Sequence, residues 1–148
     1  MVTFQQESLY EIIDEVDELL HLHYTELTHH KHVVKLKPMW HRYGALEEMG
    51  LFVVYTARDD ARLIGYSAFF VNQHLHYEDL TIGINDVLFL HPEWRKGLTG
   101  IRLLKFSESE LKKLGVHKVT WHCKDNGLDV ILKRLGYKHE EVVMGKII

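Results

Sequence analysis

DVLFLHPEWRKGLTGIRLL, residues 86–104, passes from an apolar run into a segment with helical spacing. The junction gathers cations, glycines and a hydroxyl at Arg95, Lys96, Gly97, Thr99 and Gly100. A helix N-terminus exposes unpaired N–H groups and partial positive charge, and glycine lets the backbone come close to an anion. The junction therefore indicates either an anion site suited to a diphosphate, with the threonine hydroxyl as a donor or helix cap, or an ordinary helix entry with a solvated basic turn.

Helix and strand patterns alternate along the rest of the chain. Apolar residues at helical spacing predict helices over residues 9–23, 38–49, 98–114 and 127–136. Runs rich in β-branched and aromatic residues predict strands over residues 51–56, 63–71, 81–90, 117–123 and 137–148. Ser8 followed by Glu11 predicts a capping box at the first helix. Without a repeat or linker, residues 1–148 are expected to form one α/β domain, a mixed sheet with helices on its faces.

Composition excludes several classes of protein. The formal net charge of −3 gives no reason to expect nucleic acid or an anionic membrane as partner. The single cysteine, Cys123, excludes an intramolecular disulfide and fits a reducing cytoplasm. The N-terminal residues lack the pattern of a signal peptide, and no apolar run approaches the ~20 residues that span a bilayer. We therefore expect a cytoplasmic protein.

The junction resembles the acetyl-CoA signature of the GNAT superfamily of N-acetyltransferases, Q/R-x-x-G-x-G/A after an apolar strand. Arg95 takes its first position and Gly100 its last, whereas Leu98 stands where the family normally has its middle glycine. A helix ending in KKLG, the strand VHKVTWHC and the segment ILKRLGY then follow in family order. The resemblance covers residues 51–148, and the first two helices by order alone.

This resemblance implies a GNAT-like fold and a cosubstrate. The sheet would be mixed and mostly antiparallel, with a V-shaped splay between two central parallel strands, residues 86–90 and 117–123, and helices on both faces. Backbone groups freed by the splay would bind the pantetheine arm of acetyl-CoA, and no metal is implied. The residues implied to hold acetyl-CoA are Leu88, Phe89, Leu90, Arg95, Lys96, Gly97, Leu98, Thr99, Gly100 and Asn126.

The implied reaction is direct attack by a neutral amine on the thioester, catalysed by an N-acetyltransferase. It needs a base, an oxyanion donor and an acid for the leaving thiolate. In many relatives that acid is a tyrosine five residues before the closing aromatic, and Leu132 takes this place before Tyr137. A thiolate whose conjugate acid has a pKa of about 8.5 can leave unassisted. A non-catalytic CoA-binding interaction or regulatory module is therefore the alternative function.

Candidate proton-transfer groups lie on both sides of residue 80. Asp86 opens the central strand and, by alternation, should share a face with Leu88 and Leu90. It is either a general base or a carboxylate that caps a neighbouring loop. His76 is a candidate to aid it because imidazole titrates near neutrality, and Tyr77 is a candidate acid. Both could equally be surface residues.

The polar, aromatic loop after the first helix would border the acceptor groove in this fold. Its candidate substrate contacts are Glu26, His30, Tyr43 and Trp40, to which His74 is added. The two aromatic residues could equally be core. The acceptor is expected to be a small amine or a protein lysine or N-terminus.

Four further hypotheses are weaker: a histidine-metal hydrolase, Cys123 as a nucleophile, a phage or prophage origin, and a homodimer. The twelve histidines lack a metal-ligand frame, so a histidine-metal hydrolase has little support, and Cys123 lacks an activating neighbour. The segments HLHY and RKGLTG are similar to segments of short GNAT-type proteins from phages and prophages. The apolar tail, residues 140–148, could form a homodimer or a core strand.

Overall fold

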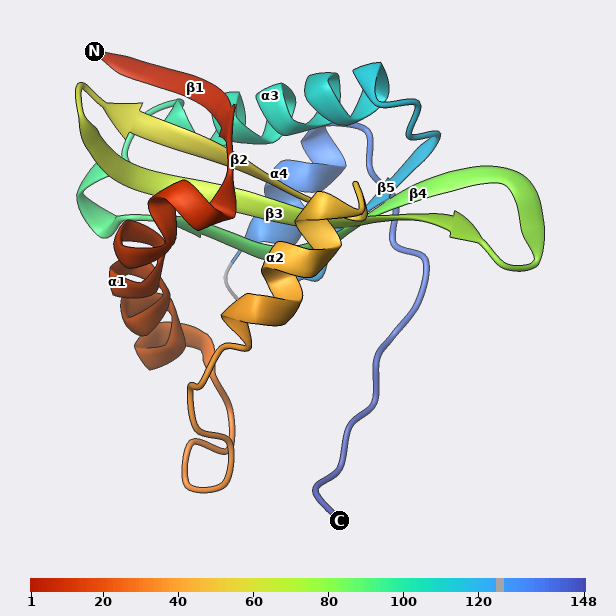
Figure 1. Cartoon of the computed structure of the whole chain (residues 1–148), viewed down its shortest axis with the longest axis horizontal. Helices are drawn as coiled ribbons and strands as arrows, with labels where there is room; N and C mark the ends of the chain where they lie inside the picture. The colour runs from red at the N-terminus through yellow and green to blue at the C-terminus, as the bar shows by residue number, and fades with distance from the viewer. Residues whose placement is uncertain (125–126) are drawn as a thin grey trace.

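The computed structural model describes residues 1–124 and 127–148. The elements are, in order, β1 (Val2–Glu7), α1 (Leu9–Leu27), α2 (Trp40–Glu48), β2 (Phe52–Asp59), β3 (Arg62–His74), β4 (Tyr77–Leu90), a 3-10 turn (Pro92–Trp94), α3 (Thr99–Lys113), β5 (Lys118–Thr120) and α4 (Leu128–Arg134). The strands form one five-stranded sheet in the order β1-β2-β3-β4-β5, antiparallel except for the parallel pair β4 and β5. Helices α1 and α2 cover one face, and α3 and α4 lie on the other (Figure 1). The expected mixed, mostly antiparallel sheet with helices on both faces is confirmed.

Strands β2 and β3 are buried on both faces, which explains their nearly continuous apolar sequences. Phe52, Val54, Tyr66 and Ala68 pack against Leu9, Ile12, Val16 and Leu19 of α1. On the opposite face, Val53, Tyr55 and Phe69 pack with Leu111 of α3. Alternate residues of the same strands therefore supply two separate cores, one under each helical layer.

The parallel pair of strands separates after three residues. Strand β4 pairs with β5 only over Ile82, Gly83 and Ile84 and then continues to Leu90. In the part of the chain that the structure describes, no strand lies beside this second half of β4 on the β5 side. This is the splay that the resemblance implied, and it leaves an open edge along the second half of β4, at the β5 end of the sheet.

Two strand predictions were wrong. Residues 2–7 form an edge strand that the sequence reading overlooked, because only Val2 and Phe4 carry an apolar alternation there. The last residues, 137–148, form no strand: Val142, Val143 and Met144 are 71%, 78% and 88% exposed, and the tail runs away from the sheet (Figure 1). A strand needs a hydrogen-bonding neighbour, which a sequence pattern does not supply. Among the described helices, none has the length and apolarity to cross a bilayer.

The N-terminus of α1 is capped from α2 rather than from its own first turn. Ser8 is the N-cap residue, but its hydroxyl donates to Glu47 Oε2 at 2.9 Å, and the Leu9 N–H donates to Glu47 Oε1 at 2.8 Å. The predicted capping box with Glu11 is therefore wrong, since a residue 39 positions away supplies the carboxylate.

Glu47→Ala is expected to lower the free energy of unfolding by about 1–2 kcal/mol. The change removes two hydrogen bonds and a negative charge from the positive end of α1. Urea denaturation followed by circular dichroism measures the loss. Glu11→Ala is the matched control, because Glu11 is exposed, and its effect should stay within about 0.5 kcal/mol. Equal losses in the two variants would contradict the assignment of the cap.

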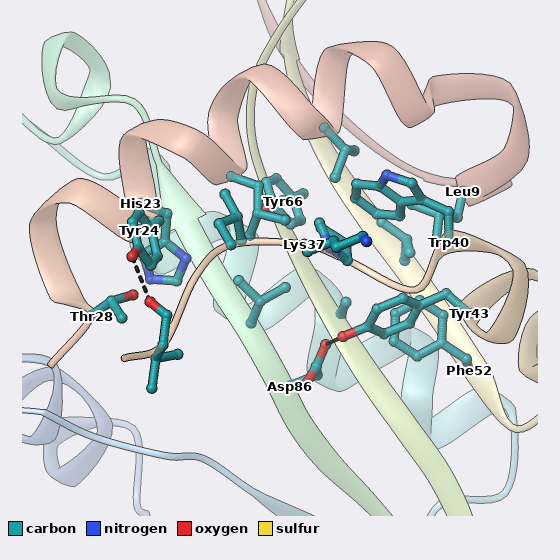
Figure 2. A pocket seen from close by; sticks show the side chains of 18 of the residues that line it. Leu9, His23, Tyr24, Thr28, Lys37, Trp40, Tyr43, Phe52, Tyr66 and Asp86 are labelled. Carbon is teal, nitrogen blue, oxygen red and sulfur yellow. Dashed lines mark hydrogen bonds between the residues drawn. The ribbon is translucent and has the colours of Figure 1, made fainter. Parts of the chain in front are cut away.

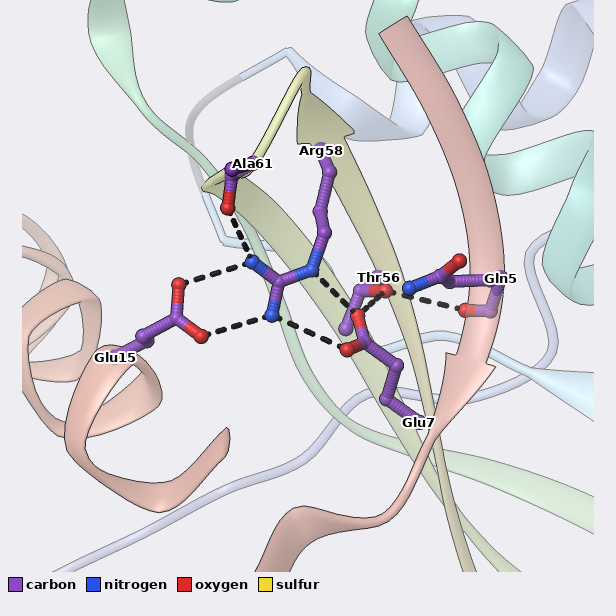
Figure 3. A network of polar contacts seen from close by, with 6 residues as sticks. All are labelled: Gln5, Glu7, Glu15, Thr56, Arg58 and Ala61. Atoms are coloured by element: carbon purple, nitrogen blue, oxygen red, sulfur yellow. Dashed lines mark hydrogen bonds and ion pairs between the residues drawn. The ribbon is translucent and has the colours of Figure 1, made fainter. Parts of the chain in front are cut away.

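Arg58 joins three segments on the other side of α1 (Figure 3). Its guanidinium donates to Glu7 of β1 at 2.9 and 3.1 Å, to Glu15 of α1 at 2.8 and 3.0 Å, and to the Ala61 carbonyl at 2.7 Å. The Thr56 hydroxyl also donates to Glu7. This network fixes β1 and α1 to the β2–β3 hairpin.

Candidate active site

A β-bulge presents Asp86 to the helical layer of α1 and α2. Ala68 pairs with Val87 and Phe69 with Asn85, so Asp86 is the extra residue of β4. The buried Asn85 amide donates to the carbonyls of Ala68 and Val87 at 3.2 and 2.9 Å, which satisfies groups at the disrupted ladder. Asp86 therefore lies on the face of Val87 and Phe89.

The expectation that Asp86 shares a face with Leu88 and Leu90 was wrong. Those two leucines pack on the α3 side of the sheet. The bulge inserts one residue and so reverses the alternation at that point. No pattern of apolar residues in the sequence marks such an insertion.

Asp86 is a carboxylate whose pKa is raised. Desolvation is the largest cause, and the Tyr43 hydroxyl and the positive charge of a protonated His122 oppose it. The Tyr43 hydroxyl donates to Asp86 Oδ2 at 3.0 Å, and burial and the carboxylate raise the pKa of Tyr43, so this donor keeps its proton. Tyr43 is held by Phe52 and Phe70, whose rings lie 4.9 and 6.2 Å from its own. The arrangement positions a carboxylate that is a stronger base than an ordinary aspartate.

Asp86 opens into a pocket of about 340 Å³ between the sheet, α1, α2 and the connecting loop (Figure 2). We call this cavity the α1–α2 pocket; its lining runs from Leu9 and His23 on α1 through Val34 and Lys37 in the loop to Trp40 and Tyr43 on α2, with Tyr66 and Asp86 on the sheet. The Tyr24 hydroxyl donates to the Val34 carbonyl at 2.6 Å, which ties the loop across the mouth of the pocket. The volume lies within the range of small-molecule sites.

His23 is a second candidate base, and it is the last residue of the helix that the apolar spacing predicted over residues 9–23. Its ring lies 5.3 Å from that of Phe89 on β4, and it lines the α1–α2 pocket. Burial lowers the pKa of His23, so the imidazole is neutral near pH 7 and can accept a proton. In the sequence, the signal that could have identified His23 is a titratable residue at a core position of an amphipathic helix.

The glycine-containing junction forms a loop between the 3-10 turn and α3. Gly97 has φ +88°, a conformation that side chains other than glycine rarely adopt. Leu98 is the N-cap residue of α3 and offers no side-chain cap, and the first turn contains no acidic residue. Thr99 is the first helical residue and does not cap the helix. The N–H groups of the first turn are thus left for an anion or water, with exposed Lys96 and Arg102 close by in the chain.

Arg95 is already paired. Its Nε donates to the Leu90 carbonyl at 2.8 Å, and its Nη2 donates to both carboxylate oxygens of Glu26 at 3.0 and 2.8 Å. Its guanidinium carbon also lies 5.3 Å from the centre of the Phe89 ring. Arg95 therefore links the loop before α3 to the end of α1, and Glu26 faces this cation rather than the α1–α2 pocket.

The open edge of β4 displays a specific set of backbone groups. The His91 N–H donates to the Ile64 carbonyl of β3 at 2.7 Å. Because antiparallel ladders alternate, Leu88 and Leu90 turn their N–H and C=O groups toward the open edge, and Phe89 turns its groups toward β3. Of the three predicted contacts, Leu88 and Leu90 are thus the residues with backbone groups at the splay.

The structure does not bring His76 or Tyr77 to Asp86. His74, His76 and Tyr77 form a cluster at the tip of the β3–β4 hairpin, where His76 and Tyr77 are exposed and the His74 and Tyr77 rings lie 4.7 Å apart. Nine residue steps along a continuous strand separate Tyr77 from Asp86, roughly 30 Å at 3.3 Å per step. The predicted cooperation of Asp86 with His76 and the acid role of Tyr77 have no geometric support.

The other candidates are divided. Tyr43 and Trp40 line the α1–α2 pocket, whereas His30 is exposed in the loop beside His32, outside the lining. Leu132 is buried in α4, and Asn126 lies outside the described residues. No group of three potential metal ligands occurs among the residues that the structure describes.

Comparison with known proteins identifies the class of this fold. The model of the acetyltransferase (GNAT) family matches residues 13–137, and the chain belongs to this family. The resemblance stated from the junction and the segments after it is confirmed at that level, as is the GNAT-like fold. A comparison with curated protein sequences gives no significant match.

Solved structures are similar over nearly the whole chain. Glucosamine-6-phosphate N-acetyltransferase from Arabidopsis thaliana has a TM-score of 0.75 at 13% identity, covering 99% of this chain and 98% of that one. A predicted acetyltransferase from Clostridium acetobutylicum, solved with acetyl-CoA, has a TM-score of 0.74 at 13% identity, covering 99% and 96%. An aminoglycoside acetyltransferase from an uncultured soil metagenomic sample, solved with sisomicin, has a TM-score of 0.76 at 12% identity, covering 99% and 95%. At these identities the similarity concerns the fold.

Proposed function

We propose that this chain is an N-acetyltransferase that moves the acetyl group of acetyl-CoA to a primary amine by direct attack, acting as one domain over residues 1–148. The observation that carries the proposal is the position of Asp86. Its carboxylate has a raised pKa, is oriented by Tyr43 and opens into a pocket beside the splay of the sheet. A carboxylate that only stabilised the fold would not need all three of these features at once.

Asp86 takes one proton from the incoming ammonium, directly or through a water, and the neutral amine then attacks the thioester carbonyl carbon. The new N–C bond forms as the C–S bond breaks, and the sulfur leaves with the electron pair. The second proton of the amine balances the thiolate, so the products are an acetamide and a thiol and no further reactant is consumed. Leu132 supplies no acid, so a water relays this second proton to the thiolate, whose conjugate acid has a pKa of about 8.5.

The residues that would hold acetyl-CoA lie along one path. The N–H and C=O groups of Leu88 and the N–H group of Leu90 suit the amide-containing pantetheine arm, as an added strand would, whereas the Leu90 carbonyl accepts from Arg95. The N–H groups of Thr99 and Gly100 at the start of α3 suit the diphosphate, with Lys96 as a mobile cation. The conformation of Gly97 and the absence of an acidic residue in the first turn support this fit.

Thiol release measures the proposed activity. Purified protein is mixed with acetyl-CoA and a panel of amines that includes spermidine, an aromatic amine and a lysine peptide, and free coenzyme A is followed with a thiol reagent. Amine-dependent release is expected, with the acetamide identified by mass spectrometry. If calorimetry shows acetyl-CoA binding but no amine gives release, the alternative function, a CoA-binding module, replaces this one.

Glu26→Gln is expected to tighten acetyl-CoA binding by up to about fivefold. Surface ion pairs contribute up to ~1 kcal/mol, and Glu26 uses this interaction to neutralise the cation that the signature assigns to the diphosphate. Calorimetry on both proteins measures the change. Weaker binding in the variant would show that Arg95 holds the loop in place through its ion pair with Glu26, and that acetyl-CoA binding requires this pair.

Other proposals stay predictions. They are a cytoplasmic location, a phage or prophage origin, and a homodimer through residues 140–148. The last is supported by the exposure of the apolar tail.

A further inference from the structure

The α1–α2 pocket has walls made largely of carbon. Val16 and Leu20 of α1, Val54 of β2 and Trp40 of α2 line it, and the ring of Phe52 closes the side beneath Tyr43 (Figure 2). A strongly polar ligand body would lose its hydration there without gaining partners. The walls therefore suit a compact apolar body.

The charges around the pocket suit a ligand with one positive charge. Among the described lining residues Asp86 is the one carboxylate, whereas Lys35, Lys37 and Lys124 contribute positive charge. A polyamine or aminoglycoside could pair one ammonium with Asp86 but would place the others near these lysines, where like charges repel. The charges that line this pocket therefore disfavour an acceptor with several positive charges.

Tyr66 adds one polar group to the apolar walls. Its side chain is 2% exposed and lines the pocket from β3, and its hydroxyl has no hydrogen-bond partner among the described residues. A buried hydroxyl without a partner is unfavourable, so its place beside a cavity points to a ligand group that completes the bond. Burial raises the pKa of Tyr66, and the neutral hydroxyl can donate or accept.

We infer that the acceptor is a primary amine with a single positive charge on a compact apolar body, and that a hydroxyl or carbonyl group on this body pairs with the Tyr66 hydroxyl. The inference rests on the proposed acetyl transfer and specifies its acceptor. Asp86 pairs with the ammonium and receives its proton, and Tyr66 distinguishes among amines that fit the apolar walls.

Four amines test the class of acceptor: 2-phenylethylamine, tyramine, 3-hydroxyphenylethylamine and spermidine, each with acetyl-CoA and the full chain. The better hydroxylated amine is expected to exceed both 2-phenylethylamine and spermidine by about tenfold or more in kcat/KM, because a site built to bind a hydroxyl discriminates against analogues that lack it. Tyramine and 3-hydroxyphenylethylamine carry the ring hydroxyl at two different distances from the amine.

Tyr66→Phe removes the hydroxyl and leaves the ring. The ratio of kcat/KM between the hydroxylated amine and 2-phenylethylamine is expected to fall to within about threefold of unity in this variant. Tyr55→Phe is the matched control, since Tyr55 is equally buried, its hydroxyl also lacks a partner among the described residues, and it packs on the opposite face of the sheet. The control should keep the wild-type ratio.

The outcomes separate the two proposals. Preference for spermidine would overturn the inference and leave the N-acetyltransferase proposal standing. An unchanged ratio in Tyr66→Phe, or an equal change in Tyr55→Phe, would show that Tyr66 is a core residue and would overturn its role in recognition. Absence of thiol release with every amine, the lysine peptide included, would overturn both proposals.

Discussion

Asp86→Asn is expected to lower kcat for amine-dependent thiol release by about 10²–10³-fold, the range of a positioned general base. The amide keeps the shape of the carboxylate and can still accept the hydrogen bond from Tyr43, but it cannot take a proton. Stopped assays of coenzyme A release at saturating acetyl-CoA measure the loss. The affinity for acetyl-CoA, measured by calorimetry, should change by less than about threefold, since Asp86 lies on the face of β4 that carries the amine pocket.

The melting temperature shows whether the Asp86→Asn variant is folded. Asp86 is exposed to the pocket, and an amide of the same shape can still accept the hydrogen bond from Tyr43, so the substitution is expected to cost little stability. The melting temperature of Asp86→Asn should therefore stay close to that of the wild type. Full activity in a folded Asp86→Asn protein would remove Asp86 from the mechanism and direct attention to the neutral imidazole of His23.

Tyr43→Phe provides a graded comparison for a positioning residue. The hydrogen bond from Tyr43 favours the ionised form of Asp86, so its loss raises the pKa of Asp86 further. Activity that depends on ionised Asp86 is lost as pH falls through this pKa, and the acid limb of the kcat/KM profile should move to higher pH. An unshifted limb would indicate that another group controls it.

Arg58→Met is expected to lower the free energy of unfolding by about 2–3 kcal/mol, more than the loss expected for Glu47→Ala. The side chains of Arg58 and Glu7 are only 13% and 16% exposed, so removing the guanidinium leaves a poorly hydrated carboxylate without its partner. Denaturation in urea with a fluorescence readout measures the loss. The double variant Arg58→Met/Glu7→Gln should recover part of it, because the orphaned charge is gone.

The two acidic partners of Arg58, Glu7 and Glu15, differ in exposure and should therefore differ in their contribution to stability. Glu15 is 45% exposed, so Glu15→Gln should cost less than about 1 kcal/mol, whereas Glu7→Gln should cost more. For Glu7, burial would raise the pKa, but the hydrogen bonds from Arg58 and Thr56 outweigh it and the pKa is lowered; for Glu15 the bond from Arg58 lowers it. Their contribution is present above the ordinary pKa of 4.5 and is lost as pH falls below it through the lowered values. Arg58→Met should flatten this acid dependence, and an equally steep dependence would place its origin elsewhere.

Much of the fold could be predicted from local pattern. Helices α1 and α3 and strands β2, β3 and β4 follow from apolar spacing, because burial on one or both faces imposes that spacing on the sequence. The junction at residues 95–100 could be recognised for a related reason. A strand-to-helix loop with a left-handed Gly97 and no acidic residue in the following turn is set by local backbone chemistry.

The candidate site was only partly accessible in this way. Asp86 was found as an acidic residue in an apolar run and Tyr43 as an aromatic residue of the segment expected to border the acceptor groove, and the structure joins them across 43 positions of the chain. His23 and Tyr66 were missed, since each fits the apolar pattern of its own element and becomes noteworthy only beside the pocket. His76 and Tyr77 are near Asp86 in sequence, yet an extended strand carries them away from it.

The amino-acid sequence by itself determined the order of the elements from α1 to α4, the family signature and the loop before α3, because these depend on neighbours within a few residues. Tertiary structure alone decided the face on which Asp86 lies, the pairing of Arg95 with Glu26, and the walls of the α1–α2 pocket. A one-residue bulge reverses the orientation of a side chain, and partners 69 positions apart meet only after the sheet has formed, so the physics that selects them is not local.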